Sequence, residues 1–396
     1  MKIAVIGGAG AMARIIIQDL SECSDVKEIL VADYQEGKAK EYAASFQDSR
    51  IKGSFVDAYK IKETANLIKG YDAVINSAQY YVNISIMNAC LKAGCHYNDL
   101  GGMFHTTRKQ LELFDDFKKA GLTAVLGIGA APGITNMLSR YGYNQLDEVE
   151  AVCLSFAAHD MTDMKGIDVF APPYSIRTIM EELLEENTQF IDGEYKTLPP
   201  LSGAKEIAFP EPIGKRTCFH TLHSEPATIP TSFKDKGVKE VTWRLSLPPE
   251  FEEKGKILAS IGLGSKEPVK VQGIEVIPLE VLAAVVEKNV KQKLEGVELK
   301  INDMAYIRSQ VIGRKNGRRV EYTIDCIARI HSRWEVNCVS SATAVPASIA
   351  AQMQAKGVIK EPGVWGPEQV IDPEYFFKEL AKREMHVQVT IKEDLS

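Results

Sequence analysis

Residues 2–13 read KIAVIGGAGAMA, and this stretch decides how the chain begins to fold. The run from Lys2 to Ile6 is short, apolar and rich in β-branched side chains, which predicts a buried strand. A glycine-rich turn follows directly, and the apolar residues from Ala11 to Leu20 recur with helical spacing. A strand, a glycine turn and a helix in this order are typical of the first βαβ unit of a dinucleotide-binding fold.

Within the turn, Gly8, Gly10 and Ala13 form the pattern G-x-G-x-x-A. Gly8 permits a tight turn, and Gly10 lacks a Cβ atom, so a pyrophosphate can approach the backbone. Ala13 is small enough for the helix to pack closely on the strand. The N–H groups and partial positive charge at the helix start, where Ala11 and Met12 lie, would hold the phosphates.

Asp33 stands at the end of the second expected strand, 23 residues after Gly10. An acidic residue about 20 residues past the glycines accepts hydrogen bonds from the adenosine ribose in such folds. Its carboxylate would repel a 2′-phosphate and no Arg follows nearby, so we predict NAD in preference to NADP. Asp57 and Ala58, after the third strand, would either contact the adenine edge or form a surface turn. Ser77 and Ala78, after the fourth strand, are expected where the carboxyl edge of the sheet meets its ligand.

The first 130 residues continue as strand-like segments that alternate with helical ones. This alternation predicts βαβ units, and strands that are apolar on both faces belong to a sheet covered on both sides. We therefore expect an α/β fold, with a Rossmann-type doubly wound parallel sheet in a dinucleotide-binding domain over residues 1–130.

The pattern changes after Pro132-Gly133. Residues 190–250 are richer in Pro, Gly and Thr and have an antiparallel character. Leu299 to Gly313 and Arg318 to Ile330 read as the two strands of a long hairpin, because Asn316-Gly317 between them is a strong turn signal. An inserted α/β domain of mixed, largely antiparallel strands follows from this.

Two helices are expected in this later part of the chain. Ser175 to Leu184 is amphipathic, and Thr343 to Ala355 is helical with Pro346 placed in its first turn. We expect the inserted catalytic and dimerisation domain over residues 131–340, and a C-terminal return to the dinucleotide-binding domain over residues 341–396.

Composition excludes several classes of protein. Among 396 residues, 47 Lys and Arg stand against 53 Asp and Glu, which gives a net charge of −6 and no basic excess for nucleic acid. No uncharged apolar run approaches the roughly 20 residues that span a bilayer, and the N-terminus has no signal-peptide pattern. The seven Cys include no Cys-x-x-Cys pair, so we expect reduced thiols in a cytoplasmic protein.

Four segments in order carry a resemblance to a known family. They read NSAQYYVN from Asn76, HYNDLGG from His96, GAAPGITN from Gly129 and PGVWGPEQVI from Pro362. Together with the opening stretch, they resemble the saccharopine dehydrogenase-like family, and the chain looks most like its NAD-dependent lysine 6-dehydrogenases. The resemblance implies a Rossmann domain, the inserted domain, a homodimer, and hydride transfer between NAD(P) and the carbon of an amine in an amino acid.

The sequence leaves three functions open. The first is NAD-dependent oxidative deamination of the lysine 6-dehydrogenase type. The alternative is a reductase that forms a secondary amine from an amino acid and an aldehyde, as in saccharopine or carboxynorspermidine formation. The third, from another class, is an NAD-binding regulator without turnover. In the lysine enzymes small residues follow the pair His220-Thr221, whereas here His223-Ser224-Glu225 follow, which places lysine itself in doubt.

Amine chemistry needs a group that moves a proton, and His is the common choice because its pKa lies near neutrality. The candidates are His220, His223, Glu225, Asp99 and His105. The two histidines near Glu225 serve either the active site or structural hydrogen bonds. Their His-x-x-His spacing would suit a metal, but no third ligand is evident, so no metal site is predicted. Asp99 precedes two glycines at a strand end, where a turn-stabilising role is equally open.

Other candidates would bind or line the substrate pocket. Arg244 lies in an otherwise apolar strand, and a substrate carboxylate would match its fork geometry. An exposed edge position or an internal ion pair is the alternative for Arg244, and Arg177 is a second candidate. Tyr80 follows the fourth strand and could line the nicotinamide pocket, or pack as an ordinary aromatic residue. Asn136 would lie at the domain junction, as a site residue or as a helix cap.

Overall fold

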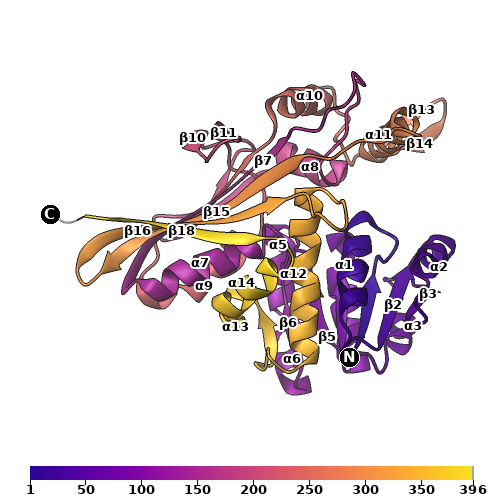
Figure 1. The fold of residues 1–396 in the computed structure, drawn as a ribbon, viewed down its shortest axis with the longest axis horizontal. Helices are drawn as coiled ribbons and strands as arrows, with labels where there is room; N and C mark the ends of the chain where they lie inside the picture. The colour runs from indigo at the N-terminus through magenta and orange to yellow at the C-terminus, as the bar shows by residue number, and fades with distance from the viewer. Residues whose placement is uncertain (395–396) are drawn as a thin grey trace.

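The computed structural model describes residues 1–394, which form two large sheets with helices between and around them (Figure 1). The first sheet has seven parallel strands in the order β17-β6-β5-β4-β1-β2-β3. Its strands are β1 (Lys2–Ile6), β2 (Glu28–Asp33), β3 (Ile51–Phe55), β4 (Ala73–Asn76), β5 (His96–Asp99), β6 (Thr123–Val125) and β17 (Gly363–Trp365). The predicted Rossmann-type sheet is confirmed.

Both faces of this sheet are covered, as the apolar strands predict. Ile3 and Val5 of β1 pack into one hydrophobic core, while Ala4 and Ile6 pack into another. Successive side chains of a strand point to opposite faces, so a continuous apolar run serves two cores. The surrounding helices are α1 (Ala11–Glu22), α2 (Glu36–Ser45), α3 (Ile61–Leu67), α4 (Asn83–Ala93), α5 (Phe104–Leu111) and α6 (Phe114–Ala120), with the short helix η1 (Tyr80–Val82) before α4.

The second sheet also has seven strands, in the order β18-β16-β15-β7-β12-β8-β9. Only the β7–β12 pair is parallel, so the predicted mixed, largely antiparallel sheet is confirmed. Its strands are β7 (Glu148–Asp160), β8 (Asn187–Ile191), β9 (Glu194–Leu198), β12 (Glu240–Ser246), β15 (Asp303–Lys315), β16 (Arg318–Arg329) and β18 (His386–Glu393). The long hairpin forms as expected, and Asn316 and Gly317 both adopt positive φ at its turn.

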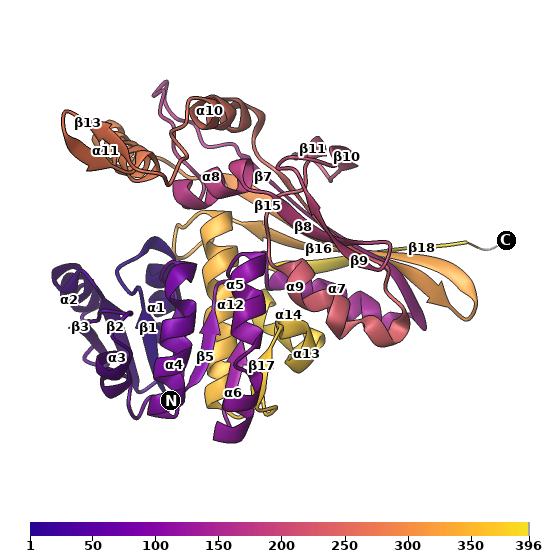
Figure 2. The ribbon, with the colours of Figure 1, turned by 180° about the vertical axis from the view of Figure 1, so that it is seen from behind.

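Several helices pack around the second sheet or project from it (Figure 2). They are α7 (Ile134–Gln145), α8 (Ile176–Leu184), α9 (Glu225–Ser232), α10 (Pro249–Ser260), α11 (Pro278–Leu294), α13 (Pro367–Val370), α14 (Pro373–Ala381) and the short η2 (Lys234–Lys236). Two small antiparallel pairs complete the architecture: β10 (Lys205–Ala208) with β11 (Lys215–Cys218), and β13 (Val269–Val271) with β14 (Ile274–Val276). In residues 1–394 no helix has the length and hydropathy needed to cross a membrane.

Two local expectations are corrected by the structure. Helix α9 was not expected within residues 190–250, because its sequence holds two prolines. Pro226 lies in its first turn, where a missing N–H is tolerated, and Pro230 lies inside the helix. Pro346 was placed in a first turn, but α12 (Cys338–Ala355) begins earlier and carries this proline in its interior.

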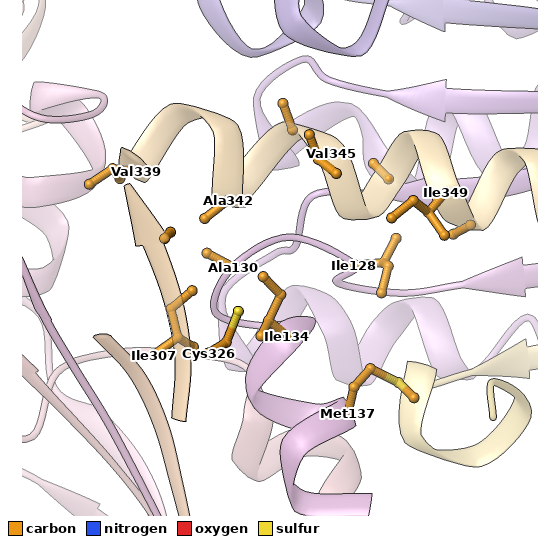
Figure 3. Close-up of a cluster of buried hydrophobic side chains, with 14 of the residues drawn as sticks. Ile128, Ala130, Ile134, Met137, Ile307, Cys326, Val339, Ala342, Val345 and Ile349 are labelled. Atoms are coloured by element: carbon orange, nitrogen blue, oxygen red, sulfur yellow. The ribbon is translucent and has the colours of Figure 1, made fainter. Parts of the chain in front are cut away.

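Helix α12 joins the two sheets. In Figure 3, Val339 and Ala342 of α12 lie toward Ile307, from the second sheet. Ile349, farther along the same helix, lies toward Ile128. All five side chains belong to one continuous hydrophobic core with those of α1 and α7. The C-terminal segment then adds β17 to the first sheet and β18 to the second, so it connects the two sheets.

Candidate active site

A cavity of about 270 Å³ lies at the junction of the two sheets. One wall comes from the turns after β1, β4 and β5, which is the edge where open α/β sheets bind their ligands. The opposite wall comes from β7, β12, α8 and the segment before α9. The residues that line it are Met12, Ser77, Ala78, Gln79, Tyr80, Leu100, Gly101, Gly102, Met103, Ala130, Ala131, Pro132, Phe156, Tyr174, Ser175, Thr178, Glu182, His223, Ser224, Trp243, Leu245, Val339 and Thr343.

The glycine turn next to this cavity has no room for side chains. A Cβ atom on Gly8 would lie 2.7 Å from Val31 Cγ1, and one on Gly7 would lie 2.6 Å from Ala78 N. Gly10 precedes helix α1, and no side chain caps the helix start, so the amides of its first turn lack side-chain partners. Ala13 is fully buried against the sheet. This arrangement fits the pyrophosphate of a dinucleotide.

Asp33 ends β2 and is half-buried beside the same turn. Its carboxylate accepts hydrogen bonds from Ala9 N at 3.1 Å and from Gln35 N at 2.8 Å. Each carboxylate oxygen can accept a second hydrogen bond, so the group remains able to bind a ribose hydroxyl. The structure thus places Asp33 next to the glycine turn, where ribose recognition requires it.

The other predicted cofactor residues divide into two groups. Met12, Ser77 and Ala78 line the cavity, whereas Asp57 and Ala58 do not. Asp57 instead accepts a hydrogen bond from Tyr59 N at 3.1 Å, in the turn that leads into α3. Ala11 lies at the first position of α1, directly after Gly10.

On the opposite wall, His223 lies between two carboxylates. Its Nδ1 lies 2.5 Å from Glu225 Oε2, and its Nε2 lies 3.8 Å from Glu182 Oε1. The imidazole stacks on the Trp243 ring, with centroids 4.1 Å apart. The other oxygen of Glu225 accepts a hydrogen bond from Thr135 Oγ1 at 3.0 Å. Because Glu225 is an acceptor at Nδ1, His223 carries its first proton there, and Nε2 is the atom that faces Glu182.

Burial and charge set the protonation of this group. Burial alone would lower the pKa of His223, but the carboxylates of Glu225 and Glu182 outweigh it and raise the pKa. Burial also raises the pKa of Glu182 to about 7, although His223 and a hydrogen bond from Tyr174 oppose the rise. Glu182 can therefore gain or lose a proton near neutral pH, and the two carboxylates favour the protonated form of His223.

Glu182 and Tyr174 were not predicted from the sequence. Ser175, Thr178 and Glu182 are spaced i, i+3 and i+7, so one flank of α8 faces the cavity. The available signal was a carboxylate next to the apolar stripe of an amphipathic helix. That pattern is usual for a solvent-facing flank, and only the position of β12 and α9 shows that this flank is buried.

Tyr80 lines the cavity and also connects its two walls. The hydroxyl groups of Tyr80 and Tyr81 donate to Glu181 Oε1 at 3.1 Å and 2.8 Å. Lys266 lies 2.7 Å from the same oxygen. Burial, followed by the negative charge of Glu181, raises the pKa of Tyr80, so its phenol stays protonated and acts as a donor.

Asp99, a candidate base, lies outside the cavity. It is buried beneath the turns that form the floor and accepts hydrogen bonds from Gly127 N at 2.7 Å and from Tyr97 Oη at 2.8 Å. Gly101 N donates to it at 3.0 Å. Burial raises the pKa of Asp99, although these donors oppose the shift. Its contacts are those of a residue that holds the turn, the other role left open for it.

His220 and Arg244 also lie outside the cavity. His220 Nδ1 is 2.9 Å from the Trp243 carbonyl oxygen, and burial, with the nearby charge of Arg244, lowers its pKa to about 4. Arg244 follows Trp243 on β12 and therefore points to the opposite face of the sheet. Its guanidinium donates to Gly203 O at 3.1 Å and to Thr242 Oγ1 at 3.1 Å, so the expected carboxylate clamp is not formed there.

The remaining candidates have contacts away from the cavity. Arg177 forms an ion pair with Glu280 at 2.7 Å, and His105 is exposed on α5. Asn136 is buried next to Thr135, and Thr135 in turn donates a hydrogen bond to Glu225. None of the described residues that line the cavity is Lys or Arg. Among the side chains that the structure describes, which exclude those of residues 249–250 and 395–396, no group of three His, Cys, Asp or Glu is arranged to hold a metal ion.

The chain is similar to known proteins over nearly its whole length. The sequence profile of the saccharopine dehydrogenase NADP binding domain matches residues 3–125, and that of the saccharopine dehydrogenase C-terminal domain matches residues 129–385. The carboxyaminopropylagmatine dehydrogenase of Synechocystis sp. is 25% identical, over 96% of this chain and 95% of its own. The carboxynorspermidine synthase of Vibrio cholerae is also 25% identical, over 94% and 93%.

Solved structures show the same fold. Apo saccharopine dehydrogenase (L-Glu forming) from Saccharomyces cerevisiae superposes with a TM-score of 0.73 at 15% identity, over 99% of each chain. The homospermidine synthase of Legionella pneumophila, in complex with NAD, gives 0.71 at 12% identity, over 98% of this chain and 91% of that one. The chain therefore belongs to the saccharopine dehydrogenase family of NAD(P)-dependent oxidoreductases.

Proposed function

We propose that this enzyme joins a primary amine of a diamine or polyamine to an aldehyde-bearing, carboxylated fragment and reduces the resulting imine to a secondary amine. One observation carries this proposal: Glu182 and His223 line the cavity wall, with Glu225 behind them, and no Lys or Arg is among the described residues of its lining. Such a wall attracts a cation. The names of both relatives describe carboxylated polyamines, which supports the same substrate class.

The cavity wall offers a binding surface for an ammonium group. Glu182 supplies a carboxylate at the cavity, 3.8 Å from His223 Nε2. Trp243 lines the same wall, and the His223 ring stacks on it with centroids 4.1 Å apart. A diamine could therefore keep one end charged against this wall while its other end reacts near Ser77 and Ala78.

Proton movement falls to His223 and Glu182. The attacking amine must first lose a proton, and a neutral Nε2 or an ionised Glu182 can accept it. Addition of the amine to the aldehyde carbon gives a carbinolamine, and its hydroxyl leaves as water when it receives a proton. Protonated His223 or Glu182 can donate that proton, because neighbouring carboxylates raise the pKa of His223 and burial raises the pKa of Glu182 to about 7.

The dinucleotide, when bound, supplies the hydride that reduces the imine carbon. This chain's part is to hold the imine against the wall formed by Met12, Ser77 and Ala78, next to the glycine turn. We further propose NAD(H) in preference to NADP(H), because Asp33 places a carboxylate where a 2′-phosphate would lie.

In the lysine 6-dehydrogenase interpretation, the same residues would serve the reverse reaction: an amine is oxidised to an imine, which water then hydrolyses. The relatives' names favour amine formation over it. The regulator interpretation has less support, because polar groups converge on the cavity beside the cofactor turn.

The proposal is tested by a matched substrate panel. Purified enzyme is given NADH with diamines and a carboxylated aldehyde, or NAD with lysine, and nicotinamide absorbance is followed. We expect NADH consumption only when amine and aldehyde are both present. NAD reduction by lysine alone would instead establish the deaminase.

His223→Gln tests the catalytic assignment, with His331→Gln as a matched control. His331 is also buried and stacks on a tryptophan, Trp334, at 3.8 Å, but does not line the cavity. We expect His223→Gln to lower kcat/KM by about 100-fold, in the range of general acid–base catalysis, and His331→Gln to affect thermal stability instead. Equal kinetic losses in both variants would contradict the assignment.

A further inference from the structure

Glu368 is a buried carboxylate that the chemistry above does not use. It lies in α13, within the PGVWGPEQVI segment, and is 1% exposed. Its two oxygens accept hydrogen bonds from Asn136 Nδ2 at 2.8 Å and from Ser232 Oγ at 2.7 Å. Both donors are neutral. Burial of an ionisable group with only neutral partners is costly, which raises the question of what this carboxylate does.

A chain of polar contacts leads from Glu368 to His223, and the single hydroxyl hydrogen of Thr135 is donated to Glu225. Asn136 Oδ1 accepts from Gly133 N at 3.0 Å, which fixes the amide so that Nδ2 faces Glu368. Thr135 Oγ1 lies 3.3 Å from Asn136 Oδ1 and 3.0 Å from Glu225 Oε1. The chain of contacts continues from Glu225 to His223 Nδ1.

Helix α9 is held at three places along the same face. Glu225, Thr228 and Ser232 are spaced i, i+3 and i+7, so they share one side of the helix. Glu225 contacts Thr135 of α7, and Thr228 Oγ1 lies 3.4 Å from Asn136 Nδ2. Ser232 contacts Glu368 of α13. Figure 2 shows α7, α9 and α13 lying close together beneath the second sheet.

Gly366 provides the space that this arrangement needs. A Cβ atom there would lie 2.6 Å from both carboxylate oxygens of Glu368. The glycine has an ordinary φ of −68°, so its role is the close approach of the side chain and not an unusual backbone conformation.

We propose that Glu368 is a positioning residue for the active site: through Asn136, Thr135 and the face of α9, it fixes the Glu225 carboxylate that orients His223. This inference deepens the proposed function, since it assigns the C-terminal segment a part in the same site. The groups that face His223 are Glu225 on α9, Glu182 on α8 and the non-titrating Trp243 on β12. A change in Glu368 therefore reaches His223 by way of Glu225.

The test measures His223 directly and needs no substrate. The chain has seven His, so ¹³C-labelled histidine gives a small set of NMR resonances, and the one missing in His223→Gln belongs to His223. Glu368→Gln replaces a carboxylate that accepts from both Asn136 and Ser232 by an amide with a single acceptor oxygen, so the two contacts cannot both be kept as they are. We expect the pKa of His223 to fall by about 0.5 unit or more, the size of one weakened hydrogen bond.

Two further variants decide between positioning and a purely structural role. In the exchange variant Glu368→Gln with Asn136→Asp, the Gln amide donates to a carboxylate at 136, and we expect the pKa of His223 to return to the wild-type value or above it. Gly366→Ala should displace the Glu368 carboxylate and lower the pKa of His223 as Glu368→Gln does. It decides the question if Glu368→Gln does not fold.

Ser348→Ala is the control for general loss of a buried hydrogen bond. Ser348 Oγ donates to Asp19 Oδ2 at 2.6 Å in a buried place away from the cavity. This variant should lower the melting temperature and leave the His223 titration unchanged. An unchanged His223 titration in Glu368→Gln and Gly366→Ala would overturn the proposal. A failed substrate panel with a shifted titration would refute the proposed function alone.

Discussion

Replacing Glu182 by Gln is expected to stabilise the protein at alkaline pH while it weakens amine binding. The carboxyl group is 3% exposed, and its pKa is raised from 4.5 to about 7, chiefly by burial. A raised pKa means that the folded state favours the neutral form. Protonation of Glu182 therefore contributes to the stability of the folded state. This contribution is fully present below pH 4.5 and is lost as the pH rises through about 7.

The size of the effect follows from the shift. One pKa unit corresponds to about 1.4 kcal/mol, so the ionised carboxylate costs the folded state about 3 kcal/mol at pH 8 and above. Gln has nearly the same shape, stays neutral, and can still accept the hydrogen bond from Tyr174. With an unfolding entropy of roughly 2 cal/mol/K per residue, the melting temperature of the variant should exceed that of wild type by about 4 °C at pH 8.

The assay is a series of thermal melts from pH 5 to pH 9. The melting temperature of Glu182→Gln should approach the wild-type value at the acid end and exceed it above pH 7. Glu181→Gln is the matched control: this neighbour is equally buried but lies 2.7 Å from Lys266, so its neutralisation breaks an ion pair and should destabilise. A difference for Glu182→Gln that does not vary with pH would refute the reasoning.

Three other changes test separate parts of the structure. The double variant Asp33→Ser with Tyr34→Arg should shift cofactor preference toward NADPH in steady-state kinetics with both cofactors; an unchanged NADH to NADPH ratio would remove Asp33 from cofactor selection. Gly8→Ala should weaken NADH binding at least tenfold by calorimetry, because its Cβ atom would lie 2.7 Å from Val31 Cγ1; wild-type affinity would show that the turn tolerates a side chain. Asp99→Ala should lower the free energy of unfolding by roughly 3 kcal/mol in urea titrations, because Gly101 N and Gly127 N lose their acceptor; a loss below 1 kcal/mol would contradict its structural role.

The first sheet could be predicted closely from local pattern. A parallel strand buried on both faces has a continuous apolar sequence, and β1 begins and ends where the sequence predicts. Helix α9 could not be found in this way, because two prolines hide it and its stability comes from packing against β12 and α7. The homodimer and the cytoplasmic location remain predictions.

The active site was predicted in part. The glycine turn follows from local sequence, because strand, turn and helix are consecutive. The contact between His223 Nε2 and Glu182 could not be predicted in this way, because Glu182 lies 41 residues earlier in the chain, on another helix. Arg244 shows the opposite case: its apolar neighbours suggested a buried charge, but strand alternation turns its guanidinium away from the cavity that Trp243 and Leu245 line.

The most direct test of the account follows a labelled hydride. Enzyme, an amine and a carboxylated aldehyde are incubated with NADH that carries deuterium at the transferred position, and the products are analysed by mass spectrometry. The account predicts a secondary amine that contains both fragments and one deuterium on the former aldehyde carbon, and little of it with His223→Gln. Release of ammonia from a single amine with NAD, and no coupled product under any condition, would contradict it.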